Sequence, residues 1–346
     1  RSARSKQKTE PPVEKEGGSA SRARFFFMKI RAIAAFGLAA LALASCTALV
    51  PSAPRSGASA WMERSAKGAS QLLYVSDLGT FDVYVYRFPS LKLAGKLHGF
   101  SDPQGICADA LGNVWIADTS SEQVIEYAHG GTKPVATLAD PVGYPVGCAV
   151  DPASGDLAVT NLYDFSGAGS VLVYKRARGT PRVYANSNLY YYYFGGYDPK
   201  GDLYVSGATT SGGYLLAVLP HGGNSIALVK IQGGALYFPG TVAWLDSTLV
   251  LGDQRCKGRM SSCFYALRVS GRSARITGTT ALHGSCDVVQ AWVDSTHIVG
   301  GDDAAYCRNG RSAVDVWRYP TGGNPSSSVR GPRIPIGAAL SAVTSR

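Results

Sequence analysis

PQGICADALGNVWIADTSSEQVIEY, residues 103–127, contains three short runs of alternating apolar residues separated by turns rich in Asp, Gly, Asn and Ser. Alternation with a period of two, bounded by turn residues, predicts three short antiparallel strands. Related stretches occur at 145–161, 193–207, 238–253 and 286–302. The chain is therefore expected to be an array of one repeated β unit from about residue 70 onward.

The spacing of these units indicates their size. Equivalent positions are separated by 42, 48, 45, 48 and 49 residues, measured between Gly105, Gly147, Gly195, Gly240, Val288 and Gly337. A second pair of apolar runs joined by a polar turn follows each unit, as in residues 123–139. A period of about 40 to 50 residues with four strands is that of a β-propeller blade.

The two ends of the array complement each other. Residues 72–97 contain three strand-like runs without a preceding first strand, and residues 336–344 resemble a first strand with nothing after it. Pairing these segments in one blade leaves no open sheet edge. We therefore predict an all-β, six-bladed propeller of four-stranded blades over residues 71–346, closed by its N- and C-terminal strands.

These units resemble the NHL-repeat and SMP-30-like six-bladed propellers. Residues 103–118 match the repeat nearly throughout and residues 145–161 match it well. Later units depart, with Trp244 and Trp292 at small or apolar positions and Val288 in place of the glycine. The resemblance implies architecture more than activity, because propellers host many unrelated functions.

The basic charge is concentrated at the N-terminus. The chain has a formal net charge of +10, of which residues 1–27 carry +4 and residues 28–46 carry +2. The remaining +4 is spread over three hundred residues, and no base-stacking module accompanies it. Nucleic acid is therefore excluded as an expected partner.

The N-terminal region has the pattern of a targeting segment. Residues 1–27 are polar and aperiodic, and we interpret them as a non-native extension upstream of Met28. Residues 28–46 combine a basic start with an apolar run at 32–43, which is too short to span a bilayer. Their end resembles the lipobox of bacterial lipoproteins, with Cys46 as the lipidated residue: Leu43, Ala44, Ser45, Cys46. The alternative is an ordinary secretory signal cleaved at the A-x-A site that Ala42 and Ala44 form.

The location follows from this interpretation. Residues 47–70 are rich in Ala, Ser, Pro and Gly and are expected to be a flexible tether. A lipid on Cys46 would hold the domain on a membrane surface, at the outer membrane or cell surface of a bacterium. Without the lipid, the protein would be secreted.

Six cysteines remain after Cys46, an even number that allows three disulfides and fifteen connectivities. In the repeat alignment Cys107 and Cys148 lie on opposite faces of equivalent strands in adjacent blades, which favours a bond between blades. Cys256 and Cys263 are seven residues apart and suggest a loop bond, and the remaining pair is Cys286 and Cys307. The alternative is six free thiols in a reducing compartment.

Polar residues follow the second strand of each unit and are expected on one rim: Asp77, Asp118, Asn161, Ser206, Asp253, Asp302 and Asp303. Oxygen ligands in a ring are suited to Ca²⁺, and Asp118, Asn161, Asp253 and Asp302 are the candidate metal ligands. In SMP-30-like lactonases a channel calcium polarises the substrate carbonyl, so the resemblance implies that possibility. The Glu and Asn-Asp ligand motifs of that family are not found, and an Asp at this position also suits a hydrogen bond to backbone amides of its own turn.

The run Tyr190–Phe194 is the most unusual local feature. Tyr191 and Tyr193 are candidates for an aromatic platform that binds a ligand, and the alternative is packing within a sheet. No catalytic motif is present in the sequence. We expect a binding module for a protein, peptide or glycan; the alternatives are a calcium-dependent lactonase and an envelope scaffold without a small ligand.

Overall fold

The computed structural model describes residues 59–307 and 310–343. Residues 1–27, the predicted signal peptide with Cys46, and the tether up to residue 58 lie outside the described residues. Within those ranges, no helix is long and apolar enough to cross a membrane. The described chain is all-β apart from five short 3-10 helices: η1 (Arg64–Ala66), η2 (Thr119–Ser121), η3 (Lys175–Ala177), η4 (Cys256–Gly258) and η5 (Ala304–Tyr306).

One sheet contains strands from both ends of the described chain. Its order is β1 (Trp61–Met62), β4 (Lys92–Leu97), β3 (Asp82–Arg87), β2 (Gln71–Asp77) and β26 (Pro335–Ala342). β26 pairs antiparallel with β2, with Ala338 opposite Val75. β1 and η1 belong to the segment 47–70 expected as a tether, and β1 adds a fifth strand by pairing Met62 with Gly95.

Three further sheets are separate. The first contains β5 (Pro103–Ala108), β6 (Val114–Asp118), β7 (Gln123–Tyr127) and β8 (Pro134–Ala139). The second contains β9 (Gly143–Val150), β10 (Leu157–Asp164), β11 (Gly167–Ala168), β12 (Val171–Tyr174) and β13 (Arg182–Tyr184). The third contains β22 (Val288–Val293), β23 (His297–Asp302), β24 (Ala313–Arg318) and β25 (Ser327–Val329).

The all-β propeller prediction is confirmed, but the six separate four-stranded blades are wrong. Eight strands form one continuous sheet, in the order β14 (Tyr191–Tyr197), β15 (Leu203–Ala208), β16 (Tyr214–Leu219), β17 (Ala227–Gln232), β21 (Ser273–Ala281), β20 (Cys263–Ser270), β19 (Thr248–Asp253) and β18 (Pro239–Leu245). The cause is a parallel pairing of the outer strands β17 and β21, with Lys230 opposite Ser273. This pairing satisfies two strand edges that would otherwise be open.

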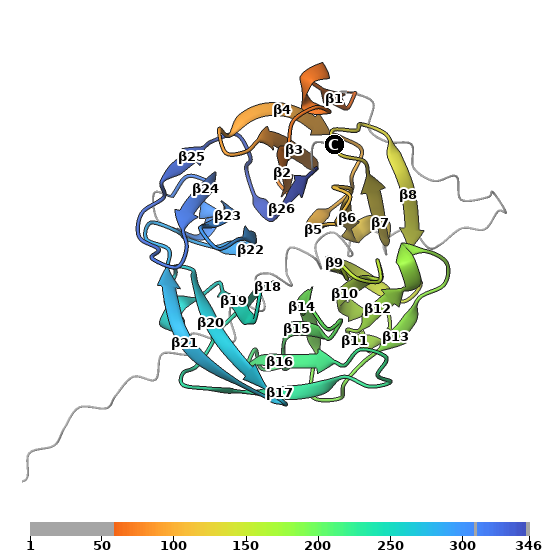
Figure 1. Cartoon of the computed structure of the whole chain (residues 1–346), viewed down its shortest axis with the longest axis vertical. Coiled ribbons are helices and arrows are strands. Elements are labelled where there is room, and N and C mark those ends of the chain that lie inside the picture. Colours follow the sequence, from red (N-terminus) through yellow and green to blue (C-terminus); the bar gives the residue numbers. More distant parts are fainter. Residues whose placement is uncertain (1–58, 308–309, 344–346) are drawn as a thin grey trace, which may run out of the picture. The chain divides into compact units, whose positions relative to one another are not determined.

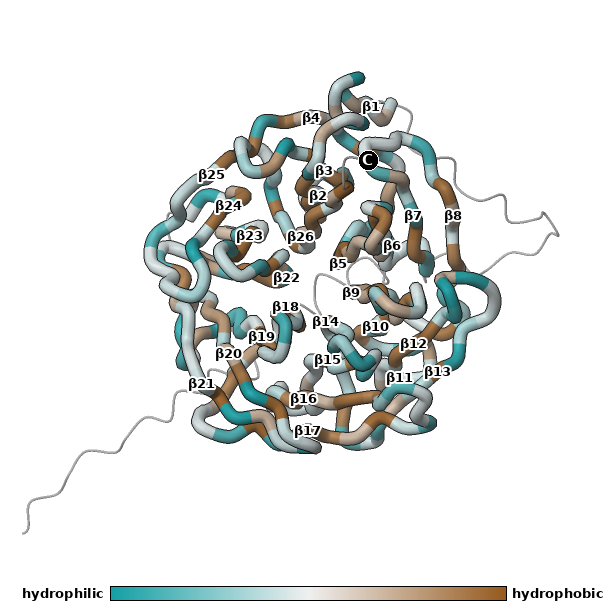
Figure 2. Tube along the Cα trace, viewed as in Figure 1, coloured by the Kyte–Doolittle hydropathy of each residue, from teal (hydrophilic) through white to brown (hydrophobic). Residues whose placement is uncertain are grey.

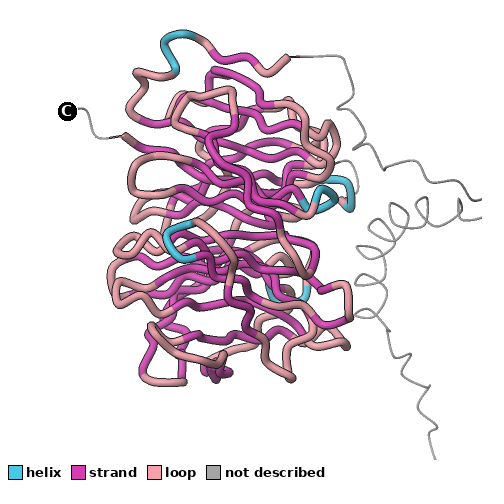
Figure 3. The backbone as a smooth tube through the Cα atoms, turned by 90° about the vertical axis from the view of Figure 1, so that its right-hand side faces the viewer, coloured by secondary structure: helices cyan, strands magenta, loops and turns pink. Residues whose placement is uncertain are grey.

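The sheets surround a centre lined by the innermost strands β26, β5, β9, β14, β18 and β22 (Figure 1). Each of these strands contacts the next, and β22 contacts β26, which closes the ring. The strands run between two faces on which the loops gather (Figure 3). Successive second strands end at the same face, so their terminal residues share one rim.

The core lies between neighbouring sheets. Trp115 of β6 packs with Leu157 of β10 and Tyr174 of β12, and all three are buried. Equivalent clusters lie between the other separate sheets and their neighbours. Figure 2 shows apolar residues concentrated on the strands and hydrophilic residues at the turns. Burial of these faces supplies the main stabilisation of the ring.

Candidate functional site

The predicted ring of acidic residues holds the backbone together. Asp118 ends β6, and its Oδ1 accepts hydrogen bonds from the backbone N–H groups of Ser101 (2.9 Å) and Asp102 (2.7 Å), just before β5. Asp253 ends β19 and accepts from the N–H groups of Tyr237 (3.0 Å) and Phe238 (2.9 Å), just before β18. Each carboxylate therefore clamps the chain that leads into the first strand of its own sheet.

The same clamp occurs at two other second strands. Asp302 ends β23 and accepts from the N–H groups of Cys286 (2.7 Å) and Asp287 (2.9 Å). Asp77 ends β2 and accepts from the N–H groups of Arg333 (3.0 Å) and Ile334 (2.6 Å). We call Asp77, Asp118, Asp253 and Asp302 the backbone clamps.

Asn161 takes a different part at the corresponding place in β10. Asn161 Nδ2 donates to Asp140 Oδ1 at 3.2 Å, whereas the amide oxygen of Asn161 is buried and accepts no hydrogen bond from the described residues. Asp140 Oδ1 accepts from the N–H groups of Val142 and Gly143, both at 3.0 Å. The clamping carboxylate is therefore supplied here by Asp140, which sequence reasoning missed because it precedes the first strand.

Ser206 does not occupy the clamp position. Gly207 lies opposite Tyr192 in the β14–β15 pair, as Asp118 lies opposite Pro103 and Asp253 opposite Pro239. Ser206 Oγ donates to the backbone oxygen of Gly240 at 2.8 Å, in the adjacent inner strand. The β14–β15 pair therefore has no clamp.

The candidate metal ligands Asp118, Asn161, Asp253 and Asp302 are not brought together as a metal centre. Among residues 59–307 and 310–343, no group of three or more His, Cys, Asp or Glu side chains has a metal-binding arrangement. Backbone amides already use at least one oxygen of each of the three carboxylates. Asp118 Oδ2 and Asn161 Oδ1 are buried and make no hydrogen bond with the described residues, and the assignment of these four residues to a metal stays a prediction.

The centre of the ring is tightly packed at the level of the repeat glycine. A Cβ added to Gly105 would lie 2.5 Å from the backbone oxygen of Val146 and 2.8 Å from the Cα of Gly147. Gln290 is buried, and its side chain bridges to β5, accepting from the Ile106 N–H at 2.8 Å and donating to the Ile106 oxygen at 3.0 Å. Backbone and side-chain atoms therefore fill the space where β26, β5 and β9 meet.

A buried acid lies beside the Asp118 clamp. Asp102 is 2% exposed, and its Oδ1 accepts a hydrogen bond from Gln104 Nε2 at 3.0 Å. Burial raises the pKa of the Asp102 carboxyl to about 6, with a further contribution from the negative charge of Asp118. Asp102 therefore gains a proton near neutral pH more readily than an exposed carboxyl.

The tyrosine run is divided between the interior and the surface. Tyr192 and Tyr193 are buried, and the ring of Tyr193 meets that of Phe238 edge-on at 5.6 Å. Tyr190 and Tyr191 are half-buried and meet edge-on at 4.7 Å. Of the two predicted platform residues, Tyr191 therefore keeps exposed surface that a ligand can contact, whereas Tyr193 is buried and packs against Phe238.

More aromatic side chains lie at the same ends of the neighbouring strands. Tyr144 is 4.8 Å from Tyr163 and 5.4 Å from Phe165 between ring centroids. Phe165 is 53% exposed and Tyr237 is 46% exposed. We define the aromatic rim as the following residues: Tyr144, Tyr163, Phe165, Tyr190, Tyr191, Tyr237 and Phe238.

Two contacts hold residues of the aromatic rim in place. The backbone N–H of Gly169, after β11, donates to the oxygen of Tyr190 at 2.8 Å, which joins the β10–β11 hairpin to the chain before β14. On the other side, the guanidinium of Arg255 lies over the ring of Phe238 at 5.4 Å. Sequence reasoning found only the tyrosine run; the other residues were detectable as aromatics at the open ends of first and second strands.

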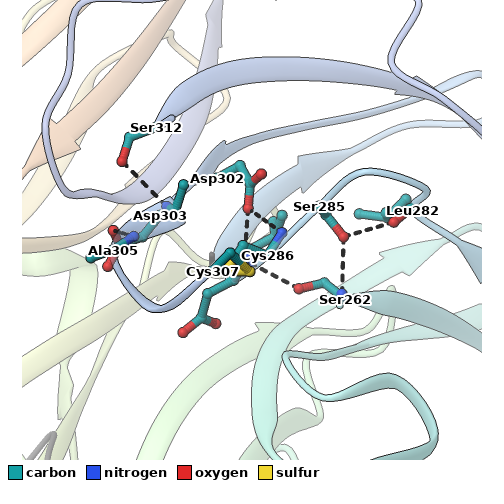
Figure 4. The surroundings of a disulfide bond; sticks show 12 residues. Ser262, Leu282, Ser285, Cys286, Asp302, Asp303, Ala305, Cys307 and Ser312 are labelled. Carbon is teal, nitrogen blue, oxygen red and sulfur yellow. Dashed lines mark hydrogen bonds between the residues drawn. A yellow bond between two sulfur atoms is a disulfide. The ribbon is translucent and has the colours of Figure 1, made fainter. Parts of the chain in front are cut away.

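Three disulfides are present: Cys107–Cys148, Cys256–Cys263 and Cys286–Cys307. These are the three predicted pairs, of which the repeat alignment favours the first, the short spacing suggests the second, and elimination leaves the third. Figure 4 shows that the third lies beside Asp302, the clamp that holds the backbone of Cys286. Disulfides persist in oxidising compartments, so this set indicates an extracytoplasmic protein.

The comparisons with known proteins support the fold. No family model matches the chain. It is 36% identical over 69 residues to the human NHL-repeat-containing protein 4, a match that covers 20% of this chain and 54% of the relative. The chain thus spans about half the length of that curated relative.

Solved structures are similar over a larger part of the chain. A chain in the crystal structure of a nidogen/laminin complex has a TM-score of 0.63 and 15% identity, covering 80% of this chain and 100% of that one. A protein of unknown function from Bacteroides caccae has a TM-score of 0.57 and 13% identity, covering 78% and 98%. At these identities the likeness concerns the fold alone.

Proposed function

We propose that this protein is an extracytoplasmic interaction module that binds a protein partner through the aromatic rim. The observation that carries the proposal is the gathering of exposed Phe165 and Tyr237 with half-buried Tyr191 at one face. Tyrosine, phenylalanine and arginine are the residues enriched at the energetic centres of protein interfaces. A peptide or a glycan would meet the same stacking surface.

Rigidity supports this role. The clamps and the buried Tyr193–Phe238 contact hold the chain beneath the rim, so little ordering is required on binding. A chain of similar fold was crystallised in a nidogen/laminin complex, which is consistent with a propeller used for protein binding.

The experiment is a binding screen of the purified protein against arrays of defined peptides and oligosaccharides. The ligands that score are measured again with Phe165→Ala and Tyr191→Ala. Each substitution is expected to weaken binding about tenfold or more, as loss of an aromatic contact does at interfaces. The matched control is Val135→Ala, an exposed residue of β8 outside the rim. Ligands that bind the rim variants and the wild type equally contradict the proposal.

The proposed location includes a lipid on Cys46, which the sequence pattern supports. Cys46→Ser is expected to release the protein from the membrane fraction into the soluble extracytoplasmic fraction. Retention of the variant in the membrane fraction contradicts the lipid anchor without bearing on the aromatic rim.

A further inference from the structure

A pocket of 430 Å³ opens on the face opposite the aromatic rim. It lies between the β9–β13 sheet and the β14–β17 part of the eight-stranded sheet, beside the turn that joins β9 to β10. That turn is at the other end of β10 from Asn161. The pocket, which we call the lower pocket, is therefore remote from the clamps and the aromatic rim.

Aromatic and apolar groups form part of the lower pocket. Tyr184 of β13 and Tyr197 of β14 are half-buried, and Leu203 and Leu219 are buried beside them. Burial raises the pKa of the Tyr197 hydroxyl, with further contributions from Asp156, Asp151 and Tyr184, so this phenol stays protonated at neutral pH. Neutral phenol rings offer an apolar face and a polar tip to a small ligand.

Basic side chains line the opening. Lys175, Arg176 and Arg182 are exposed. No ion pair to any of the three occurs among the described residues. The Arg182 guanidinium lies over the Tyr184 ring at 5.1 Å, and its Nη2 donates to Asn224 Oδ1 at 3.0 Å. The basic groups are thus available to an anion from solvent.

The two acidic groups of the lower pocket are used by the chain itself. Asp151 accepts from the Ala153 N–H at 3.0 Å and from Ser154 Oγ at 2.6 Å. Asp156 Oδ1 accepts from the Arg176 N–H at 2.8 Å. That bond holds Arg176 in the left-handed region, at φ 49°, which a non-glycine residue adopts at a cost of about 1–3 kcal/mol. The turn that contains Lys175 and Arg176 is therefore fixed in place at the edge of the pocket.

We propose that the lower pocket binds a sugar acid, with the ring against Tyr184 and Tyr197 and the carboxylate at Arg176 and Arg182. Guanidinium groups form strong, directional hydrogen bonds with carboxylates, and tyrosine faces pack on the C–H face of a sugar ring. His221 also lines the pocket and offers a hydrogen bond to a ring hydroxyl. This ligand is distinct from the partner of the aromatic rim.

The experiment is a calorimetric titration of the full-length protein with galacturonic acid and its dimer, galactose and inorganic phosphate. The sugar acids are expected to bind at least ten times more tightly than galactose. The double variant Arg176→Gln/Arg182→Gln should weaken sugar-acid binding at least tenfold, and Tyr184→Ala should do the same without affecting phosphate. The matched control is Arg330→Gln, which replaces an exposed arginine directly after β25. This variant should bind the sugar acid as tightly as the wild type does.

Four results overturn the proposal. They are undetectable sugar-acid binding, equal affinity for galactose, phosphate binding as tight as that of the sugar acid, and unchanged affinity in the double arginine variant. The variants alter exposed or half-buried side chains, and an unchanged melting temperature shows that they are folded. Tyr191→Ala should leave the titration unchanged, so failure here is distinguishable from failure of the aromatic rim.

Discussion

The sheet β5–β8 and the β14–β17 part of the eight-stranded sheet differ in how the chain before their first strand is held. In β5–β8, Asp118 clamps the amides of Ser101 and Asp102 before the first strand. In β14–β17, Gly207 occupies the clamp position, and the chain before β14 is held instead by the side chain of Asn186, whose Nδ2 donates to the backbone oxygen of Ile226 at 2.8 Å. The unit nearest to the repeat pattern therefore keeps its carboxylate clamp, whereas the divergent unit replaces the clamp with a neutral contact next to half-buried Tyr190 and Tyr191.

Removal of the disulfides is expected to have the largest effect on the free energy of unfolding. Removing Cys107–Cys148 with the double variant Cys107→Ser/Cys148→Ser should lower the free energy of unfolding by about 4 kcal/mol, because the bond closes a long loop between two sheets. Cys256→Ser/Cys263→Ser should cost about 2 kcal/mol, since its loop is short. Urea unfolding measures both; a larger effect for the short loop contradicts the ranking.

The repeat glycine tests the packed centre. Gly105→Ala should destabilise the protein by about 3 kcal/mol, because the new Cβ would collide with the backbone of β9. Gly278→Ala in β21 is the control, with its nearest atom 3.7 Å from the added carbon, and should change stability by less than about 0.5 kcal/mol. Equal melting temperatures for the two variants would show that the centre is more open than described.

Mutation can compare the Asp118 clamp with the Asn186 contact that replaces a clamp before β14. Asp118→Ala leaves two amides without their charged acceptor and should cost about 2–3 kcal/mol. Asn186→Ala removes a neutral side-chain bond to the backbone oxygen of Ile226 and should cost about 1 kcal/mol. Denaturant unfolding of both variants measures the two losses of unfolding free energy. A larger loss for Asn186→Ala than for Asp118→Ala would contradict the stronger role of the clamp.

The effect of Asp102 on stability depends on pH. Its pKa of about 6 exceeds that of the unfolded chain, so the folded state binds the proton more tightly. The stability that this proton contributes is present at acidic pH and is lost as pH rises from about 4 through 6. Asp102→Asn should therefore be more stable than the wild type by about 1–2 kcal/mol at pH 7.5 and no more stable at pH 4. A difference independent of pH would contradict the shifted pKa.

The sequence predicts the propeller and the Cys107–Cys148 bond because both follow from local alternation and repeat register, as in residues 103–118. The other two bonds are predicted only from a short spacing and by elimination. It does not predict the joining of β17 to β21, since a parallel pairing between outer strands depends on where two edges meet in space. The polar residues on the rim are identified by residue type, but Asp118 uses Oδ1, and Asp253 both of its oxygens, to accept from backbone amides. Residue type alone does not distinguish a clamp from a metal ligand, because both require a carboxylate at a strand end.

The central claim is that the second-strand carboxylates hold the backbone and leave the aromatic rim for binding. The most direct test is thermal unfolding of the wild type and Asp118→Ala, each in millimolar CaCl₂ and in EDTA. The account predicts the same melting temperature for the wild type in both solutions and the same lower value for Asp118→Ala in both. A wild type that is stabilised by Ca²⁺, with a difference from Asp118→Ala that disappears in EDTA, would contradict it.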